Sequence, residues 1–401
     1  MGTTARRDGL RRVLDRPLAS YQIVLGASAL LVGLGLVMVL SSSSVLAYRA
    51  DGNSYAIVAK QALFAGLGLL GAFVAVKLPL AFWRRSAVPL LLVVLALIGL
   101  TLIPGVGQEV NGNRNWLPLF AGFMLQPSEF AKLALVLWIG RLYAGRQKAL
   151  DGPRATHQML MPVVPVGVLI ALLIGAGQKD VGTALVIVAV LGGMLWTVGL
   201  PRRWVAVGLA LVGVAGVLAV AAAPHRVSRM LAFLDPMADP EVTGYQTIHS
   251  MMALATGGFW GVGLGGSRQK WGALPNAHTD FILSVVGEEL GLFGTLVVLG
   301  LFVVLIAMGV RIALRATDPF AHYVAVGVTT WIAVQAVINI GMVLGLLPVI
   351  GIPLPLMSYG GSSLLVTMTA LGLLARCALA EPGAQAALAA RRPTSRQEKK
   401  R

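Results

Sequence analysis

The sequence predicts an all-α membrane protein, a polytopic bundle of about ten transmembrane helices with both termini in the cytoplasm. Two observations carry this prediction. Hydrophobic residues make up 57% of the 401-residue chain and charged residues only 12%, whereas soluble globular proteins average about a quarter charged residues. The apolar residues also fall into repeated segments of about 20 residues, the length at which a helix crosses the hydrocarbon core with its backbone groups hydrogen-bonded internally.

The expected spans follow a basic N-terminal tail, residues 1–20. They are residues 22–46, 56–78, 87–104, 126–144, 158–176, 181–200, 204–223, 281–310, 320–348 and 355–379. The first span is too long for the core of a cleavable signal peptide, so we expect it to remain as an anchor. The membrane domain then extends over residues 21–380, and a second basic tail, residues 381–401, follows it.

Basic residues set the expected orientation, because Lys and Arg accumulate on the cytoplasmic side of membrane spans. With the N-terminus inside, the loops 79–86, 145–157, 201–203 and 311–319 are cytoplasmic. They contain Arg84, Arg85, Arg146, Lys148, Arg154, Arg202, Arg203, Arg311 and Arg315. This distribution explains the net charge of +16 without a nucleic-acid partner, since basic tails next to spans also meet anionic lipid.

Two long connections then lie outside the cytoplasm. Residues 105–125 include GNRNWLPLFAGF, in which turn residues alternate with aromatic residues suited to the membrane interface. Residues 224–279 form the largest loop, between the seventh and eighth spans, and are rich in Gly, Pro, Met and Trp. Loops of this length usually have a function, so we expect both to fold back over the outer mouth of the bundle.

The stretch LPNAHTDFILSVVGEELG, residues 274–291, places three carboxylates at the start of the eighth span. If a helix starts near Thr279, its period puts Asp280 and Glu288 on one stripe with small residues, as in a cavity wall, and Glu289 on the far side. Alternatively, Asp280 caps the helix start, where Asp is favoured. Glu288 would lie about 12 Å further in, where ionisable residues normally face a pocket or a partner. For Glu289, a structural ion pair fits equally well.

Further charged pairs stand at the expected outer ends of other spans. In QPSEFAK, residues 126–132, Glu129 and Lys132 are i, i+3 neighbours. They fit either a self-neutralising ion pair or a lysine that faces a phosphate group. In QKDVGTA, Lys179 and Asp180 stand between the fifth and sixth spans, but charges at helix ends also snorkel toward water, so this pair alone predicts little.

The long outer loop and the segment before the last span add polar residues. The basic residues of the loop are His225, Arg226, Arg229, Arg268 and Lys270. Its GGFWGVGLGG stretch permits tight turns near a ligand, but no GK[ST] follows, which excludes a P-loop. The five histidines lack metal-ligand spacing, so we expect His278 to be a hydrogen-bonding neighbour of Asp280. In residues 351–363, a plain turn does not explain Ser358 together with Tyr359 and two further serines.

Together these motifs resemble the SEDS family, the proteins of shape, elongation, division and sporulation. VNGNRNWL, QPSEFAKLALVLW, QKDVGTALVI, RMLAFLDP, LPNAHTDFILSVVGEELG and PLPLMSYGGSSLL occur in the family's order and spacing and cover most of the chain. The loop GSRQKWGALPNAH is similar to the actinobacterial division branch rather than the elongation branch. The chain departs from the family at Asn115, where many members have arginine, and at Asn276, where many have glutamate.

The resemblance implies a glycosyltransferase that polymerises lipid II, the undecaprenyl-pyrophosphate-linked disaccharide peptide, into β-1,4 peptidoglycan strands. Polymerisation would take place on the outer side of the bacterial cytoplasmic membrane, at the division septum. Asp280 matches the family's candidate general base. Pyrophosphate is already a good leaving group, so cations rather than a second acid would assist its departure. The substrate-binding residues that we expect are Trp116, Glu129, Lys132, Lys179, Asp180, Arg226, Arg229, Lys270, His278, Glu288 and Ser358.

The resemblance also implies partners: a class B penicillin-binding protein, which is a transpeptidase with one membrane helix, and other membrane proteins of the division machinery. It predicts no metal-binding residues and leaves open whether a divalent cation assists the pyrophosphate. The alternatives are a lipid II flippase, the elongation enzyme of the family, or a non-catalytic scaffold. A flippase favours internal repeats and ionisable groups near the midplane, whereas the charged residues here cluster toward the outer ends of the spans.

Overall fold

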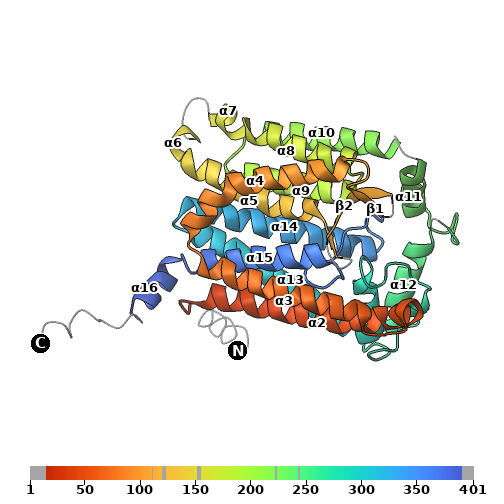
Figure 1. The fold of residues 1–401 in the computed structure, drawn as a ribbon. Coiled ribbons are helices and arrows are strands. Elements are labelled where there is room, and N and C mark those ends of the chain that lie inside the picture. Colours follow the sequence, from red (N-terminus) through yellow and green to blue (C-terminus); the bar gives the residue numbers. More distant parts are fainter. Residues whose placement is uncertain are drawn as a thin grey trace, which may run out of the picture.

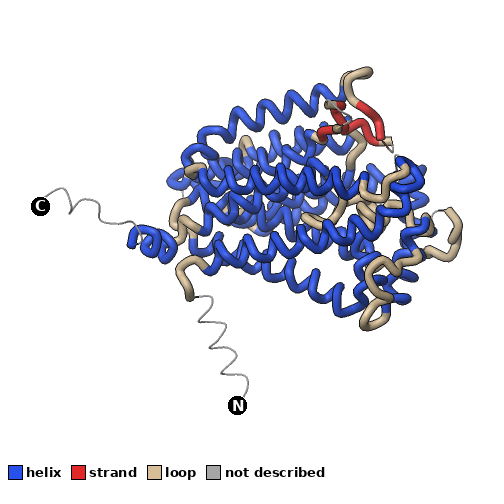
Figure 2. The backbone as a smooth tube through the Cα atoms, turned by 60° about the horizontal axis from the view of Figure 1, so that its bottom comes forward, coloured by secondary structure: helices blue, strands red, loops and turns tan. Residues whose placement is uncertain are grey.

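The structure, a computed structural model, describes residues 15–110, 112–119, 123–150, 155–221, 224–242 and 244–390. Its main body is a bundle of long helices that run roughly parallel or antiparallel to one another (Figure 1). One end of the bundle carries a small sheet and most of the long loops, and we call it the sheet end (Figure 2). We call the opposite end, where the short connections carry Arg and Lys residues, the basic end.

Each of the ten predicted spans coincides with helical structure. The helices are α2 (Ala19–Asp51), α3 (Ala56–Lys77), α4 (Leu80–Leu102), α5 (Pro127–Gly145), the run of α7 (Ala155–Leu160), α8 (Val163–Leu172) and η2 (Leu173–Gly177), α9 (Val181–Thr197), α10 (Arg202–Ala221), α13 (Ile282–Arg315), α14 (Pro319–Val343) and α15 (Gly361–Ala378). In the described part of the chain, seven helices are long and apolar enough to cross a membrane, and α9 is a shorter apolar helix. The predicted polytopic helical bundle is confirmed.

The centre of the bundle forms around α14. This helix packs against α13, α5 and α9, and its largest fully buried side chain is Trp331. α15 packs closely along α3, where a Cβ on Gly372 would lie 2.6 Å from the Cα of Ala72. Small residues at such contacts let helix backbones approach, which is how membrane helices gain packing without a hydrophobic driving force. Large apolar side chains such as Leu209 and Val217 remain exposed on α10, as expected for a lipid-facing surface.

The first long loop, residues 105–125, forms a small antiparallel sheet. Its strands are β1 (Gln108–Val110), β2 (Asn113–Pro118) and β3 (Met124–Leu125), in the order β1-β2-β3. The all-α prediction omits this sheet, because strands of two to six residues are too short to produce a clear alternating pattern. Arg114 N donates to Gln178 O at 3.1 Å, which ties β2 to the segment before α9. The predicted folding back of this loop over the bundle is confirmed.

The large loop between α10 and α13 also folds onto the bundle. It contains α11 (Pro224–Leu234), α12 (Tyr245–Gly257) and the 3-10 turn η3 (Gln269–Trp271). The segment after α12 forms backbone hydrogen bonds with α13 next to Gly291. Gly291 interrupts this helix, with φ 67° and ψ −165°. There Leu292 N donates to Gly258 O at 2.9 Å. A Cβ on Gly291 would lie 2.4 Å from Gly261 N, so only glycine fits this position without movement of the backbone.

Short helices lie at the basic end. They are α6 (Gln147–Leu150) and α16 (Pro382–Ala390). The predicted C-terminal tail therefore begins with α16, and its residues 391–401 lie outside the described residues. Residues 1–14 of the predicted N-terminal tail lie outside them as well.

Candidate functional site

A cavity of about 240 Å³ opens at the sheet end, where the sheet meets the first turns of several helices. We call it the sheet-end cavity. Its polar lining residues are Asn113, Asn115, Trp116, Gln126, Glu129, Lys132, Asp180, Thr183, Asn276, Thr279, Asp280, Gln335, Tyr359, Ser362 and Ser363. They come from β2, α5, α9, α14 and α15, from the residues just before α5 and α9, and from the segments before α13 and α15, so segments far apart in the sequence build one polar site.

Asp280 lies in the turn before α13, not on the helix. The N-cap residue of α13 is Phe281, whose side chain makes no capping hydrogen bond, and Asp280 stands one position before it. The alternative role of Asp280 as a helix cap is therefore wrong. From α14, Asn339 Nδ2 donates to the backbone oxygen of Asp280 at 2.8 Å and to that of Ile352 at 2.8 Å. One buried amide thus fixes the Asp280 turn and a neighbouring part of the cavity wall together.

Glycine at position 351 leaves room beside the Asp280 carboxylate. Gly351 has φ 80°, and a Cβ there would lie 3.6 Å from Asp280 Oδ2. A larger side chain at this position would therefore contact the carboxylate and fill the cavity next to it. Asp280 itself is partly exposed at the cavity wall.

Glu129 and Lys132 form a buried ion pair in the cavity wall. Lys132 Nζ lies 2.7 Å from Glu129 Oε2, and the two side chains are 2% and 4% exposed. The same Nζ donates to Gln335 Oε1 at 3.2 Å and lies 4.9 Å from the centre of the Trp331 ring. Trp331 Nε1 also donates to Gln335 Oε1, at 2.7 Å. Both predicted interpretations are thus compatible with the structure: the charges are paired, and the pair stands at the cavity.

Asp180 links three elements of the cavity wall. As the N-cap of α9, it accepts through Oδ1 from Thr183 N at 2.9 Å. Its Oδ2 accepts from Thr183 Oγ1 at 2.9 Å, Asn115 Nδ2 at 3.0 Å and Gln126 Nε2 at 3.2 Å. The neighbouring Lys179 is exposed and does not line the cavity, so only one member of this predicted pair belongs to the site.

Glu288 is buried outside the sheet-end cavity and holds the large loop. It accepts from Ser267 Oγ at 2.5 Å and from Arg268 N at 3.0 Å. The expected shared cavity wall of Asp280 and Glu288 is therefore wrong. The physical reason is that α13 starts only at Ile282, so Asp280 does not follow the helical period, and the loop after α12 covers Glu288.

Glu289 and Lys270 hold the same loop as Glu288, and we call the contacts of these three residues with residues 265–268 and Ser41 the loop anchor. Glu289 accepts from Ser41 Oγ of α2 at 2.6 Å and from Ser267 N at 3.2 Å. Lys270 Nζ lies 3.9 Å from Glu289 Oε1, donates to Gly265 O, and belongs to a side chain that is 8% exposed. Of the two alternatives left open for Glu289, the structure fits the structural ion pair. The prediction that Lys270 contacts substrate is not supported by its position, because its ammonium group is held inside the loop anchor and not at the cavity.

His278 and Ser358 fix the cavity wall from behind. Ser358 Oγ donates to Thr279 O at 2.6 Å and accepts from Leu354 N at 2.8 Å. His278 O accepts from Tyr359 N at 2.9 Å, and the two rings lie 5.6 Å apart. Burial lowers the pKa of His278, so the imidazole is neutral at neutral pH. Both residues are placed to position the wall rather than to line it.

Of the remaining predicted residues, Trp116 lines the cavity, whereas the side chains of Arg226 and Arg229 lie outside the described residues. Trp116 lines the cavity from β2 and is partly buried. Arg226 and Arg229 fall within α11, but their side chains lie outside the described residues. Within the part of the chain whose side chains are described, Lys132 is the one predicted cation on the cavity wall.

Some residues of the site are absent from the predicted set. Gln335 and Asn339 stand four residues apart in the apolar helix α14, and amides at such positions normally have a partner or a function. That signal could have identified them. Gln126 and Thr183 gave no comparable signal, because their role depends on hydrogen bonds to Asp180 that join separate helices.

The carboxylates of the cavity do not converge on one point. Among the described residues, no three His, Cys, Asp or Glu side chains form a group suited to a metal ion. Glu129 is paired with Lys132, and Asp180 accepts four hydrogen bonds. The resemblance left open whether a divalent cation assists the substrate pyrophosphate, and the described residues offer no such group for one.

Known proteins are similar to the chain over most of its length. The FtsW/RodA/SpoVE family, described as cell cycle proteins, matches residues 21–381. A Mycobacterium tuberculosis protein named "Probable peptidoglycan glycosyltransferase FtsW" is 43% identical over 379 residues, which covers 94% of this chain and 71% of the relative. Stage V sporulation protein E of Bacillus subtilis is 41% identical over 347 residues, covering 86% of this chain and 93% of the relative.

Solved structures share the fold. One comes from work on "Structural coordination of polymerization and crosslinking by a peptidoglycan synthase complex"; it has a TM-score of 0.69 and 31% identity and covers 88% of this chain and 96% of its own. The rod shape determining protein RodA of Thermus thermophilus has a TM-score of 0.64 and 28% identity, over 90% of this chain and 96% of its own. The bundle is therefore common to these proteins over most of their length.

Proposed function

The chain belongs to the FtsW/RodA/SpoVE family and is a peptidoglycan glycosyltransferase of the FtsW type, and we propose that it polymerises lipid II in the sheet-end cavity. One observation carries the proposed site. The carboxylate of Asp280 stands in a polar cavity whose wall also holds the Glu129 and Lys132 ion pair and the fixed carboxylate of Asp180. A base and a cation at one cavity are the groups that sugar transfer from a pyrophosphate requires.

Asp280 is proposed as the general base. The 4-hydroxyl of the acceptor sugar attacks the anomeric carbon of the donor, and the Asp280 carboxylate takes the hydroxyl proton. The bond between the anomeric carbon and the pyrophosphate oxygen breaks, and undecaprenyl pyrophosphate leaves with the electron pair. Direct displacement converts the α-linked donor into a β-1,4 product. The hydrogen bond from Asn339 to the Asp280 backbone keeps the turn in place for this step.

Lys132 is proposed to stabilise the charge of the departing pyrophosphate. Its ammonium group stands at the cavity, where low local dielectric strengthens an interaction with phosphate oxygens. The contacts to Glu129 and Gln335 hold the lysine in one position. Trp116 on β2 is proposed to shape the acceptor side of the same cavity.

The sheet end is proposed to face the outside of the cytoplasmic membrane, at the division septum. The basic end then lies in the cytoplasm, as the positive-inside rule requires. A class B penicillin-binding protein is proposed as the transpeptidase partner, and this is supported by the similar structure from work on a complex that combines polymerisation with crosslinking. Other membrane proteins of the division machinery are further proposed partners.

Polymerisation of labelled lipid II by the purified protein tests this function. The partner transpeptidase is present but inactivated by penicillin, so that any glycan polymer comes from this chain. We expect polymer from wild type and from Thr256→Trp, which adds bulk at an exposed site on α12. We expect none from Ser363→Trp, which fills the sheet-end cavity. Transbilayer movement of lipid II in proteoliposomes without any polymer would instead support a flippase and contradict the proposal.

A further inference from the structure

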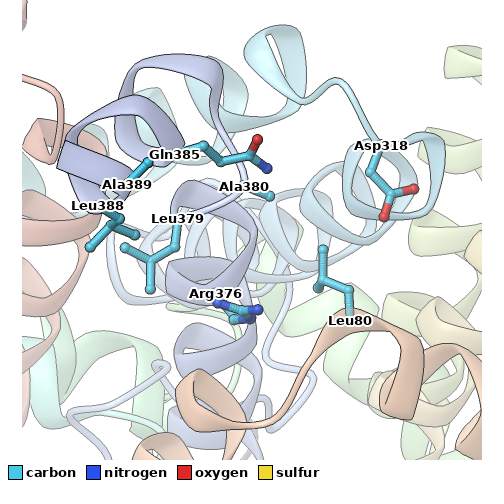
Figure 3. A pocket seen from close by; sticks show the side chains of 8 residues that line it. All are labelled: Leu80, Asp318, Arg376, Leu379, Ala380, Gln385, Leu388 and Ala389. Carbon is cyan, nitrogen blue, oxygen red and sulfur yellow. The ribbon is translucent and has the colours of Figure 1, made fainter. Parts of the chain in front are cut away.

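A second pocket, of about 370 Å³, lies at the basic end, on the side of the bundle opposite the sheet-end cavity. We call it the basic-end pocket. Residues from four parts of the chain line it: Leu80 at the start of α4, Asp318 before α14, Arg376 in the last turn of α15, and Leu379, Gln385 and Leu388 in and before α16. In Figure 3 the Arg376 side chain lies between Leu379 and Leu80, while Gln385 and Asp318 occupy the facing side.

The described structure does not satisfy the hydrogen-bonding groups of Arg376. Its Nε is buried and has no hydrogen-bond partner, and no described carboxylate forms an ion pair with its guanidinium group. A basic residue in the last turn of a helix interacts favourably with the helix dipole, which accounts for the charge at this position. It does not account for the buried Nε, because a buried polar group without a partner is destabilising. The guanidinium group of Arg376 lines the pocket and has no described partner, so its other nitrogen atoms can donate to an acceptor bound there.

The chemistry of the lining limits what that molecule can be. Arg376 contributes one positive charge and Asp318 one negative charge, and Gln385 adds a neutral amide. Asp318 Oδ1 already accepts from Phe320 N at 3.0 Å as the cap of α14, while no described residue donates to its Oδ2. Leu80, Leu379 and Leu388 supply apolar walls. The pocket therefore combines separate sites for an anion and a cation with an apolar surface.

We propose that the basic-end pocket binds the headgroup of a zwitterionic phospholipid, one that carries a phosphate and an ammonium group. The Arg376 guanidinium donates to the phosphate oxygens, for which its planar fork is suited. The Asp318 carboxylate accepts from the ammonium group, and the leucines contact the glycerol and the first acyl carbons. The pocket lies at one end of the membrane helices, where headgroups reside, and basic pockets between such helices are known places of lipid recognition. This proposal does not depend on the proposed function.

Lipid binding by the purified full chain in detergent tests the proposal, with native mass spectrometry as the readout and phosphatidylethanolamine as the probe. Arg376→Gln removes the charge from the pocket. Arg315→Gln removes the same charge from an exposed position at the same end, outside the pocket. We expect Arg376→Gln to weaken binding by at least about tenfold, as loss of a hydrogen-bonded charge does, and Arg315→Gln to bind like wild type. Equal binding by both variants and wild type would overturn the proposal.

Two further measurements identify the ligand. Asp318→Asn keeps a helix-capping oxygen, so α14 is preserved, and we expect it to weaken binding of phosphatidylethanolamine but not of phosphatidylglycerol, which has no ammonium group. Equal weakening of both lipids would overturn the role of Asp318. Free glycerophosphoethanolamine should compete poorly; competition as strong as that of the lipid would point to a soluble phosphate ester instead.

If Arg376→Gln does not fold, Leu388→Trp keeps the proposal testable. This substitution fills the pocket from α16 without any change of charge. We expect it to abolish specific lipid binding, and wild-type binding by this variant would overturn the proposal.

Discussion

Lys132→Met tests the buried ion pair at the sheet-end cavity. The substitution leaves a side chain of similar length and removes the charge. It leaves Glu129, which is 4% exposed at its side chain, without the partner 2.7 Å away. It also removes the hydrogen bond to Gln335 and the contact with the Trp331 ring. Breaking a buried pair by removing one partner costs about 3–5 kcal/mol, so we expect the free energy of unfolding to fall by that amount.

The double variant Glu129→Gln/Lys132→Met separates the pair from its members. It removes both charges. Replacing a buried ion pair by uncharged side chains often changes the free energy of unfolding little, so we expect the double variant to recover at least about 2 kcal/mol of the stability lost in Lys132→Met. The assay is equilibrium unfolding in mixed micelles for wild type, both single variants and the double variant. If the loss in the double variant equals the sum of the single losses, the two charges are not coupled and the reasoning is refuted.

The same double variant distinguishes the two interpretations of Lys132. If the lysine stabilises the departing pyrophosphate, the folded double variant should polymerise lipid II at least about 100-fold more slowly than wild type, because loss of one preorganised donor has effects of that size. If it polymerises at the wild-type rate, the pair is structural and Lys132 takes no part in the reaction.

Three further predictions concern the surroundings of the cavity. Asn339→Leu leaves the backbone oxygens of Asp280 and Ile352 without their donor, so we expect a loss of about 2–4 kcal/mol in the free energy of unfolding, measured by the same unfolding assay. Gly291→Ala places a Cβ against the large loop between α10 and α13, so limited proteolysis should cleave that loop faster than in wild type. Burial lowers the pKa of His278 in the folded protein, so its contribution to stability is complete above the unfolded pKa of 6.5 and is lost as pH falls below it; His278→Asn should reduce the slope of unfolding free energy against pH in that range, and an unchanged slope would contradict this.

The long helices could be predicted from the sequence, and the small sheet could not. Apolar runs of about 20 residues identify spans whatever they pack against, because the bilayer demands internally bonded backbone. The strands β1–β3 depend instead on pairing with one another and on the bond from Arg114 N to Gln178 O, which no local pattern encodes. The same limit applies to Gln126 and Thr183, whose roles arise where separate helices meet at Asp180.

The candidate site was predictable where charged residues stood at the start of an apolar run. Asp280, Glu129 and Lys132 all line the sheet-end cavity, as expected. Glu288 does not, because the helical period was extended through residues that form a turn before Ile282. Lys270 and Lys132 were both predicted to bind substrate, and only the fold distinguishes a cation in the loop anchor from one at the cavity.

The most direct test of the central claim is the rate of lipid II polymerisation by Asp280→Asn, which keeps the size of the side chain and removes the base. Glu241→Gln, at an exposed position in the large loop, is the matched control, and lipid II binding is measured for both variants. We predict that Asp280→Asn binds lipid II like wild type but polymerises it at least about 100-fold more slowly, while Glu241→Gln is fully active. A wild-type rate for Asp280→Asn would contradict the account, since the base would then have to be another group.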